Sequence, residues 1–442
     1  MFRWCWVLFF VSTWPLVLSQ YSQYPRLSTL AGSGAAGYAD GAGTLALFSG
    51  SRGVAVDLNG NIYIADTANH RIRMVTTAGV VTTVAGSGVA GYADGTGTSA
   101  KFNSPSGIAV DVKIAAPNGM LYVCDSGNHR IRVINSGVVT TLAGNGTAGY
   151  ADGTGSSAMF NSPSGVFAFV YWGGRLYIAD SLNHRIRTVT SAGVVTTVAG
   201  GGVAGYSDGV GTQALFNFPY GIVMDYGQYG SGNLLITDRD NHCIRMISGT
   251  TVTTPVGTAG VAAFADSTGS LAAFFSPTGF ACNGGSNFVV ADRDNYRVRS
   301  ISLPNSFTFV VTTVAGNGSA ATAVDGTTGA ATAQYSPYGV ALQNNVNSVY
   351  VVGGNAVLKV MSFACTSADA ACAALGDLYY ATSGAGWTST GWNVASGGYA
   401  WNYCSFNGVT CVNGNVTQLY VPLPPGKRVA IRTHELQLMF RT

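Results

Sequence analysis

The sequence contains few charged residues. Only 9% of its 442 residues are Asp, Glu, Lys or Arg, against roughly 25% in an ordinary soluble domain. The formal net charge is +3, and the lysines are Lys101, Lys113, Lys359 and Lys427. A chain with so little positive charge has no basic stripe for phosphate groups, so nucleic acid is not an expected partner.

Glutamate is almost absent. Of the nineteen acidic residues, Glu435 is the single glutamate and the other eighteen are aspartates. Aspartate favours turns, whereas glutamate is common within helices, so a helical architecture is disfavoured. The length allows two to four domains, and each can have a hydrophobic core large enough to fold without disulfide bonds or a structural metal.

The amino terminus carries an apolar run that is too short to span a membrane. Arg3 precedes apolar residues 4–18, and small or apolar residues stand before Gln20. A spanning helix needs about 20 apolar residues, so the run predicts a signal peptide over 1–19. No later stretch is long enough to span a bilayer, so a secreted or extracellular protein is expected, at the cell surface only if the gene continues into a membrane span. Asn-x-Ser/Thr triplets mark three candidate glycosylation sites: Asn145, Asn317 and Asn415.

A short motif with Asp, Asn and His recurs along the chain. Three copies read Asp-x-x-Asn-His-Arg-Ile; the fourth has Cys243 after its His, the fifth has Tyr296 in place of His, and the sixth keeps only Asn355. The Asn of each copy stands at 69, 128, 183, 241, 295 and 355, at intervals of 59, 55, 58, 54 and 60 residues. Six copies at this period predict a repeat architecture.

Each repeat contains four short runs of the β type. In the second repeat they span 107–111, 120–124, 130–134 and 138–142, separated by Gly, Asn, Asp and Ser. Four strands joined by turns make one propeller blade, so the repeats predict an all-β, six-bladed propeller over 20–363.

The sixth repeat has no fourth strand of its own. A segment at Thr29–Gly32 precedes the first complete blade and resembles the fourth strand of the other repeats. We therefore expect Ser28–Ala31 to pair with Val357–Met361, which closes the ring and removes an exposed sheet edge.

These motifs closely resemble the NHL-repeat family, whose name comes from a similar Asn-His-Leu motif. The resemblance covers residues 25–363 and implies an NHL-type propeller. The family includes binding modules, extracellular sensor domains, RNA binders and an amidating lyase, so the fold does not determine the function.

The repeated polar residues lie at the turn from the second to the third strand, where we expect a structural role. Asp and Asn can bond nearby backbone N–H groups there, and Arg can pair with Asp. The histidines of neighbouring blades would lie on the order of 10 Å apart, too far to share a metal ion. No metal, cofactor, Ser/His/Asp set or carboxylate pair is therefore predicted. The predicted turn residues are Asp66, Asn69, Arg71, Asp125, Asn128, Arg130, Asp180, Asn183, Arg185, Asp238, Asn241, Asp292, Asn295 and Arg297.

Connections of about twenty residues join the blades, longer than the roughly 12–15 residues beyond which a loop is usually functional or locally packed. They contain Gly-Tyr-Ala-Asp-Gly or a relative, and a phenylalanine that we expect to pin the loop to a blade.

The loops and the turns should emerge on one face, because the chain reverses at each strand. The tyrosines of these loops are candidate binding residues, with packing onto their own loops as the alternative: Tyr38, Tyr92, Tyr150 and Tyr206. The loop aspartates could ligate calcium, although one per loop is weak evidence.

Three cysteines fall in predicted strands. Cys124, Cys243 and Cys282 are expected to be buried small hydrophobic residues, although a Cys243–Cys282 bridge between neighbouring blades is conceivable.

A second module begins near Cys365. Paired cysteines, interleaved tryptophans and a final run at Val416–Tyr420 resemble the amino-terminal cap of extracellular leucine-rich repeat proteins. The resemblance covers 364–422. In a chain with a signal peptide, the short spacings predict disulfides Cys365–Cys372 and Cys404–Cys411. The tail 423–442 is basic and patternless, which suggests a chain truncated after 422 with foreign sequence beyond.

These features predict a secreted recognition or scaffold protein that binds a protein or carbohydrate partner through the long-loop face. We expect it to be part of a larger receptor or adhesion-like protein. The alternative is an enzyme, a lyase or hydrolase, with its site at the central channel; polar residues from several innermost strands converging there would favour it.

Overall fold

The computed structural model describes residues 26–111, 119–169, 174–225, 232–282, 287–303, 308–316, 318, 336–343 and 348–361. It also describes the backbone of 409–412, 415–422 and 428–432. The chain divides into two compact units, Tyr24–Ser362 and a second unit of Met1–Gln23 with Phe363–Thr442. The predicted signal peptide, Asn317 and the Cys365–Cys372 pair lie outside the described residues.

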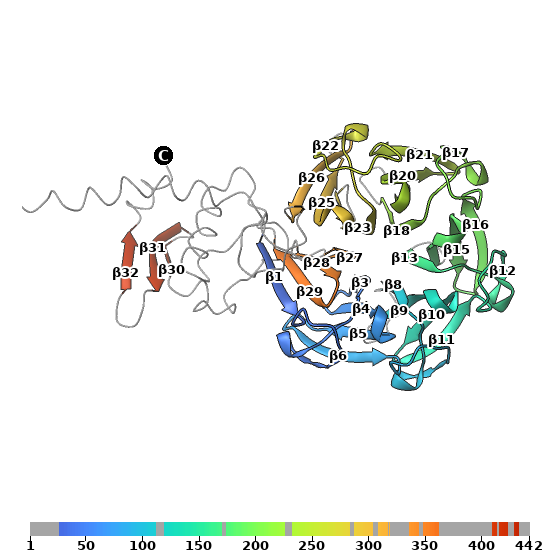
Figure 1. Cartoon of the computed structure of the whole chain (residues 1–442). Coiled ribbons are helices and arrows are strands. Elements are labelled where there is room, and N and C mark those ends of the chain that lie inside the picture. Colours follow the sequence, from blue (N-terminus) through green and yellow to red (C-terminus); the bar gives the residue numbers. More distant parts are fainter. Residues whose placement is uncertain are drawn as a thin grey trace, which may run out of the picture. The chain divides into compact units, whose positions relative to one another are not determined.

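The first unit is a ring of six antiparallel sheets, the blades of a propeller (Figure 1). The innermost strands of neighbouring blades contact one another all the way around the ring. The six-bladed prediction is therefore confirmed. From the innermost strand outward, the sheets are β3-β4-β5-β6-β2, β8-β9-β10-β11-β7, β13-β14-β15-β16-β12, β18-β19-β20-β21-β17, β23-β24-β25-β26-β22 and β27-β28-β29-β1.

The strand bounds follow the predicted runs closely. In the second blade, β8 spans Pro105–Asp111, β9 Met120–Asp125, β10 Arg130–Asn135 and β11 Val138–Ala143. The other four-strand sets are β3 (Gly53–Val56), β4 (Ile62–Asp66), β5 (Arg71–Val75), β6 (Val80–Ala85); β13 (Pro163–Phe169), β14 (Arg175–Asp180), β15 (Arg185–Thr190), β16 (Val194–Ala199); β18 (Pro219–Met224), β19 (Leu234–Asp238), β20 (Cys243–Ser248), β21 (Thr251–Val256); and β23 (Pro277–Cys282), β24 (Asn287–Asp292), β25 (Arg297–Ser302), β26 (Val310–Ala315).

Five blades have a fifth, outermost strand that the sequence did not predict. Each is two residues long and comes from the long loop that precedes the blade. A single 3-10 turn follows each of them. These elements are β2 (Gly41–Ala42) with η1 (Gly43–Leu45), β7 (Gly95–Thr96) with η3 (Gly97–Ser99), β12 (Gly153–Thr154) with η5 (Gly155–Ser157), β17 (Gly209–Val210) with η7 (Gly211–Gln213), and β22 (Ser267–Thr268) with η9 (Gly269–Leu271).

The sixth blade contains β27 (Gly339–Gln343), β28 (Ser348–Gly353) and β29 (Ala356–Met361). Its outer strand is β1 (Arg26–Ala31), which pairs antiparallel with β29 from Arg26 opposite Met361 to Ala31 opposite Val357. The predicted closure by the amino-terminal strand is confirmed. It joins the two ends of the ring by backbone hydrogen bonds.

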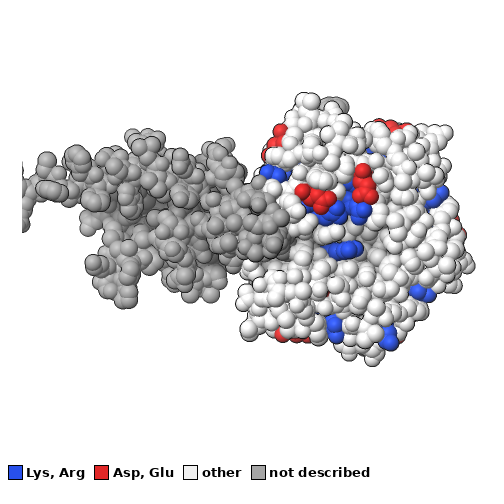
Figure 2. Space-filling view, in the orientation of Figure 1, with Lys and Arg blue, Asp and Glu red and all other residues white. Residues whose placement is uncertain are grey.

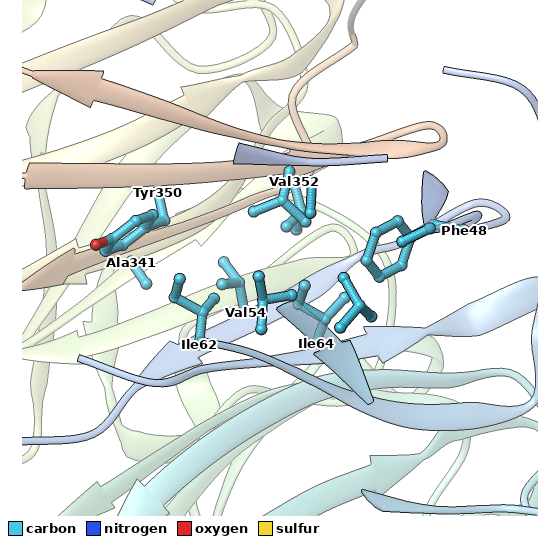
Figure 3. Close-up of a cluster of buried hydrophobic side chains, with 12 residues drawn as sticks. Phe48, Val54, Ile62, Ile64, Ala341, Tyr350 and Val352 are labelled. Atoms are coloured by element: carbon cyan, nitrogen blue, oxygen red, sulfur yellow. The ribbon is translucent and has the colours of Figure 1, made fainter. Parts of the chain in front are cut away.

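The core is distributed between the blades. Where the first and sixth blades meet, the buried cluster includes Ile62 and Ile64 of β4 and Tyr350 and Val352 of β28, with Phe48 from the first long loop (Figure 3). Phe48 is fully buried, as are its equivalents Phe102, Phe160, Phe216 and Phe274. The prediction that these side chains pin the loops is confirmed.

Cys124 and Cys243 are buried free thiols in β9 and β20, as predicted. Cys282 is only partly buried, against the prediction, because it is the last residue of β23. Because Cys243 forms no disulfide, the conceivable Cys243–Cys282 bridge is not present.

In the second unit, β30 (Val409–Val412), β31 (Asn415–Pro422) and β32 (Arg428–Arg432) form a three-stranded antiparallel sheet. Val416–Tyr420 is a strand as expected. The segment predicted to be patternless is different, since Arg428–Arg432 pairs with β31 from Gln418 to Pro422. The β-branched residues Val429 and Ile431, on one face of Arg-Val-Ala-Ile-Arg, are compatible with such a strand. Cys404 lies outside the described residues, and only the backbone of Cys411 and Asn415 is described.

Candidate functional site

The predicted turn residues hold the blades together. In the first blade, Asp66 ends β4 and is followed by the 3-10 turn η2 (Thr67–Asn69). One Asp66 carboxylate oxygen accepts a hydrogen bond from the backbone N–H of Ser49 at 2.8 Å, and the other accepts one from the Asn69 side chain at 2.9 Å. Asn69 also donates to the carbonyl of Gly37 at 2.7 Å. The turn is thereby bound to the long loop, so both lie on one face. The equivalent turns are η4 (Ser126–Asn128), η6 (Ser181–Asn183), η8 (Arg239–Asn241) and η10 (Arg293–Asn295).

The arginine that pairs with the buried aspartate is not the one that we predicted. Arg71 donates to the carbonyls of Asn69 and Ser87. The partner of Asp66 is Arg73, at 2.8 Å, and both side chains are fully buried. Arg71 and Arg73 share one face of β5. The two differ in burial: Arg73 is fully buried between Asp66 and Asp40, whereas Arg71 is partly exposed and stacks on the Tyr38 ring.

Arg73 also binds the loop aspartate Asp40 at 2.7 Å, so each such arginine joins a buried and a half-exposed carboxylate. Five blades repeat this Asp–Arg–Asp triad: Asp40–Arg73–Asp66, Asp94–Arg132–Asp125, Asp152–Arg187–Asp180, Asp208–Arg245–Asp238 and Asp266–Arg299–Asp292. The loop carboxylates that could have ligated calcium are thus occupied by guanidinium groups. The sequence carries the signal that we missed, because the fourth repeat has Cys243 at the first arginine position but retains Arg245 at the second.

Burial raises the pKa of the buried aspartate in each triad, and that of Asp238 to about 6. The arginine, the Asn side chain and a backbone N–H oppose this effect, because each stabilises the carboxylate. Among the described residues, no group of three or more His, Cys, Asp or Glu side chains is placed to hold a metal ion.

The histidines connect neighbouring blades. His129 follows η4 in the left-handed conformation, with φ of 54°, and its Nδ1 accepts a hydrogen bond from the backbone N–H of Ser162 at 3.1 Å. His70, His184 and His242 make the same bond to Ser104, Phe218 and Ser276. Burial lowers the pKa of His129, His184 and His242, which keeps their acceptor nitrogens unprotonated.

The four candidate tyrosines occupy equivalent, half-exposed positions on the long loops. The Tyr92 ring lies against Arg130, whose guanidinium carbon is 3.8 Å from the ring centre, and its hydroxyl is 3.2 Å from that of Thr141. Tyr38, Tyr150 and Tyr206 bond Thr83, Thr197 and Thr254 in the same way. One side of each ring is therefore packed onto its own blade, while 43–47% of each residue stays accessible.

Phe264 is a fifth aromatic residue of this set, which we did not predict. Phe264 precedes Asp266 by two residues, as each tyrosine precedes its own loop aspartate, and lies over Arg297 at 3.7 Å. Three of the loops also expose a valine three residues before the aromatic residue: Val89, Val203 and Val261. An exposed valine three positions before an exposed aromatic residue thus recurs in three of the loops on this face.

Comparisons with known proteins agree with this architecture. The family model of the NHL repeat matches residues 48–73 and 102–134, which lie in the first two blades and the loops before them. The chain is a six-bladed β-propeller that carries NHL repeats.

Protein SUPPRESSOR OF QUENCHING 1, chloroplastic, from Arabidopsis thaliana is 32% identical over 293 residues, 61% of this chain and 26% of that protein. NHL repeat-containing protein 2 from Homo sapiens is 28% identical over 319 residues, 62% of this chain and 42% of the relative. The chain therefore spans well under half the length of these relatives.

Among solved structures, a protein of unknown function from Bacteroides thetaiotaomicron superimposes with a TM-score of 0.57 at 20% identity, covering 76% of each chain. An auxiliary nutrient binding protein from Bacteroides ovatus gives 0.53 at 13% identity, covering 77% of each chain. At these identities the likeness shows the fold alone. Within the described part of the chain, no helix is long and apolar enough to cross a membrane.

Proposed function

We propose that the chain is a secreted, non-enzymatic recognition protein that binds a protein or carbohydrate partner through the long-loop face of the propeller. The observation that carries this proposal is the repeated exposed pair on the loops. Val89, three residues before Tyr92, is 61% exposed, and Val203, three residues before Tyr206, is 67% exposed. Exposed aromatic residues with apolar neighbours, set in a polar surround, are typical of interfaces.

The packing of the rings on arginine supports recognition rather than weakening it. A tyrosine fixed by Arg130 and Thr141 loses little conformational freedom on binding, so more of its contact energy appears as affinity. The accessible edge and the neighbouring valine remain for a partner.

Secretion is part of the same proposal. The apolar run over residues 4–18 supports it, and Asn145 of an Asn-x-Thr triplet is exposed on a long loop. The resemblance of 364–422 to a leucine-rich repeat cap supports a place within a larger receptor or adhesion-like protein.

These points can be tested on protein secreted from a eukaryotic host. Non-reducing peptide mapping should find Cys365–Cys372 and Cys404–Cys411 linked and a glycan on Asn145. Free thiols at those four positions would contradict the cap assignment.

The binding face can be tested by screening a display library of extracellular proteins and a glycan array. Val89→Asp and Val203→Asp should abolish capture of any partner found, because a charge would enter the apolar contact. Leu58→Asp is the matched control: Leu58 is exposed on the short turn between β3 and β4, at the opposite end of the strands. Loss of capture in the Leu58 variant with retention in the valine variants would place the site on the other face.

An enzyme with its site at the central channel is the second candidate. One observation favours it, because polar side chains from several blades gather around the centre of the ring. These side chains are mainly arginines and tyrosines, which suit the binding of an anion.

A further inference from the structure

Six equivalent positions surround the centre of the propeller, each directly before a glycine of an innermost strand. A Cβ atom added to any of these glycines would lie 1.9–2.5 Å from a backbone oxygen of the next blade. Gly165 faces the carbonyl of Tyr220 in this way, and Gly339 faces that of Arg52. The six positions follow one another around the centre in the order Arg52, Ser106, Ser164, Tyr220, Thr278 and Tyr338.

Three of the six positions have small hydroxyl side chains that bond within the ring. Ser106 and Ser164, for example, each bond the serine that begins the neighbouring 3-10 turn. The other three side chains are large and close to one another. The ring centres of Tyr220 and Tyr338 are 6.3 Å apart, and the guanidinium carbon of Arg52 is 5.2 Å from the Tyr338 ring.

Two further arginines enter from the 3-10 turns. In the first three blades the turn begins with Thr or Ser, whose hydroxyl donates to a proline carbonyl of the next blade. The turn begins with Arg239 in the fourth blade and with Arg293 in the fifth. Arg293 donates from Nη1 to the Tyr338 hydroxyl at 3.2 Å. Figure 2 shows basic and acidic side chains gathered near the centre of this face.

Each of these two arginines is bound by the aspartate that follows it. Asp240 accepts from Nε and Nη2 of Arg239 at 2.6 and 3.0 Å, and Asp294 does the same for Arg293 at 2.7 and 2.6 Å. The cluster therefore contains three guanidinium groups, those of Arg52, Arg239 and Arg293, and two carboxylates. Its net charge is +1.

Two groups of this cluster have no hydrogen-bond partner within the described part of the chain, and both can donate hydrogen bonds. Arg52 is exposed, and its side chain makes no ion pair or hydrogen bond within the described part of the chain. Tyr220 is 6% exposed, and its hydroxyl is buried without a hydrogen-bond partner. Burial raises the pKa of Tyr220 to about 12, so the hydroxyl keeps its proton. A buried donor without an acceptor is costly, and an acceptor placed there would remove that cost.

We propose that the centre of the ring binds the carboxylate group of a small organic acid, held by Arg52, Arg239 and the Tyr220 hydroxyl. A set of donors selects an acceptor, and one net positive charge selects a single negative charge. The planar guanidinium fork matches a planar carboxylate. A phosphate dianion fits less well, because Asp240 and Asp294 would repel its second charge. The site lies at the centre of the face that carries the long loops and the 3-10 turns, but its residues are not the loop tyrosines and valines, so it does not depend on their function.

The test is calorimetric titration of the full chain with named probes. D-glucuronate and benzoate supply a carboxylate on a sugar and on an aromatic ring, D-glucose is the uncharged match to glucuronate, and inorganic phosphate is the dianion. At least one carboxylate should bind, more tightly than phosphate and with no binding of glucose. The two carboxylates distinguish a sugar acid from an aromatic acid. Failure of both to bind, or tighter binding of phosphate, would overturn the proposal.

The variants use residues that the chain itself has at equivalent positions. Arg52→Ser and Arg239→Ser should each weaken carboxylate binding at least about tenfold, since each removes a charged hydrogen-bond donor. Arg175→Ser is the matched control, because Arg175 begins β14 at the other end of the blade and the net charge changes equally. An equal loss in the Arg175 variant would show a non-specific charge effect and refute the site.

Tyr220→Phe removes one oxygen and leaves the ring. Without ligand, this variant should melt at the same temperature or higher, because the unsatisfied hydroxyl is gone. Its carboxylate affinity should fall about fivefold or more. Unchanged affinity would refute the role of this hydroxyl. The Val89→Asp variant should bind the probes normally, so failure here is distinguishable from failure of the loop-face proposal.

Discussion

Replacing the buried arginine of one triad should destabilise the propeller far more than replacing its neighbour on the same strand. Arg132 is fully buried and donates to Asp125 at 2.7 Å, to Asp94 at 2.7 Å and to two backbone carbonyls. Arg132→Met leaves the Asp125 carboxylate buried without its counter-charge. Loss of one partner of a buried pair costs about 3–5 kcal/mol.

Arg130→Met is the matched control, two residues earlier on β10. Arg130 donates only to the carbonyls of Asn128 and Asn145, and it stacks on Tyr92. No carboxylate is left unpaired by its removal, so we expect a loss of about 1–2 kcal/mol from its hydrogen bonds and stacking. The fourth blade already has Cys243 at this position.

The assay is urea unfolding followed by circular dichroism, with Asp125→Asn and the double variant completing a cycle. Asp125→Asn alone leaves the guanidinium buried beside a neutral amide, so the double variant should be more stable than the sum of the single losses predicts. Asp94→Asn should cost about 1 kcal/mol or less, because the Asp94 side chain is 43% exposed. Equal losses in the Arg132 and Arg130 variants, or simple additivity in the cycle, would refute the reasoning.

Three further predictions concern the ring. Because the folded-state pKa of His129 is lowered by burial, its stabilising contribution is complete above about pH 6.5 and falls as the pH drops below that value. His129→Asn keeps an acceptor and the left-handed backbone, so its melting temperature should fall less between pH 7 and 5 than that of the parent; an identical fall would contradict the histidine contact. Deleting 21–32 should abolish the cooperative melting transition seen by calorimetry, because β29 then has an open edge, and an unchanged transition would disprove closure. Gly165→Ala should prevent folding or lower the melting temperature strongly, since its Cβ would lie 1.9 Å from the Tyr220 carbonyl oxygen; a stable, native-like variant would show that the blades can move apart.

The repeat, the number of blades, the strands and the closure of the ring could all be predicted from the amino-acid sequence. These features depend on local signals: alternating Val and Ile make strands, and Gly, Asn and Asp end them. Closure could be predicted by counting strands. The chain has one extra strand before the first blade, and the sixth blade lacks its fourth strand. The buried phenylalanines were also predictable, because a large apolar residue recurs at the same place in each long loop.

Which polar groups meet became clear from the folded ring alone. Arg71 and Arg73 both lie near Asp66 in sequence, and Arg73 is the one that is fully buried beside it. The fifth strands are two residues long and have little β pattern of their own, so they form only against a finished blade. The centre of the ring is the extreme case: Arg52, Tyr220 and Tyr338 lie far apart in the chain, and closure of six blades brings them together. Their chemistry depends on contacts between repeats, which no single repeat encodes.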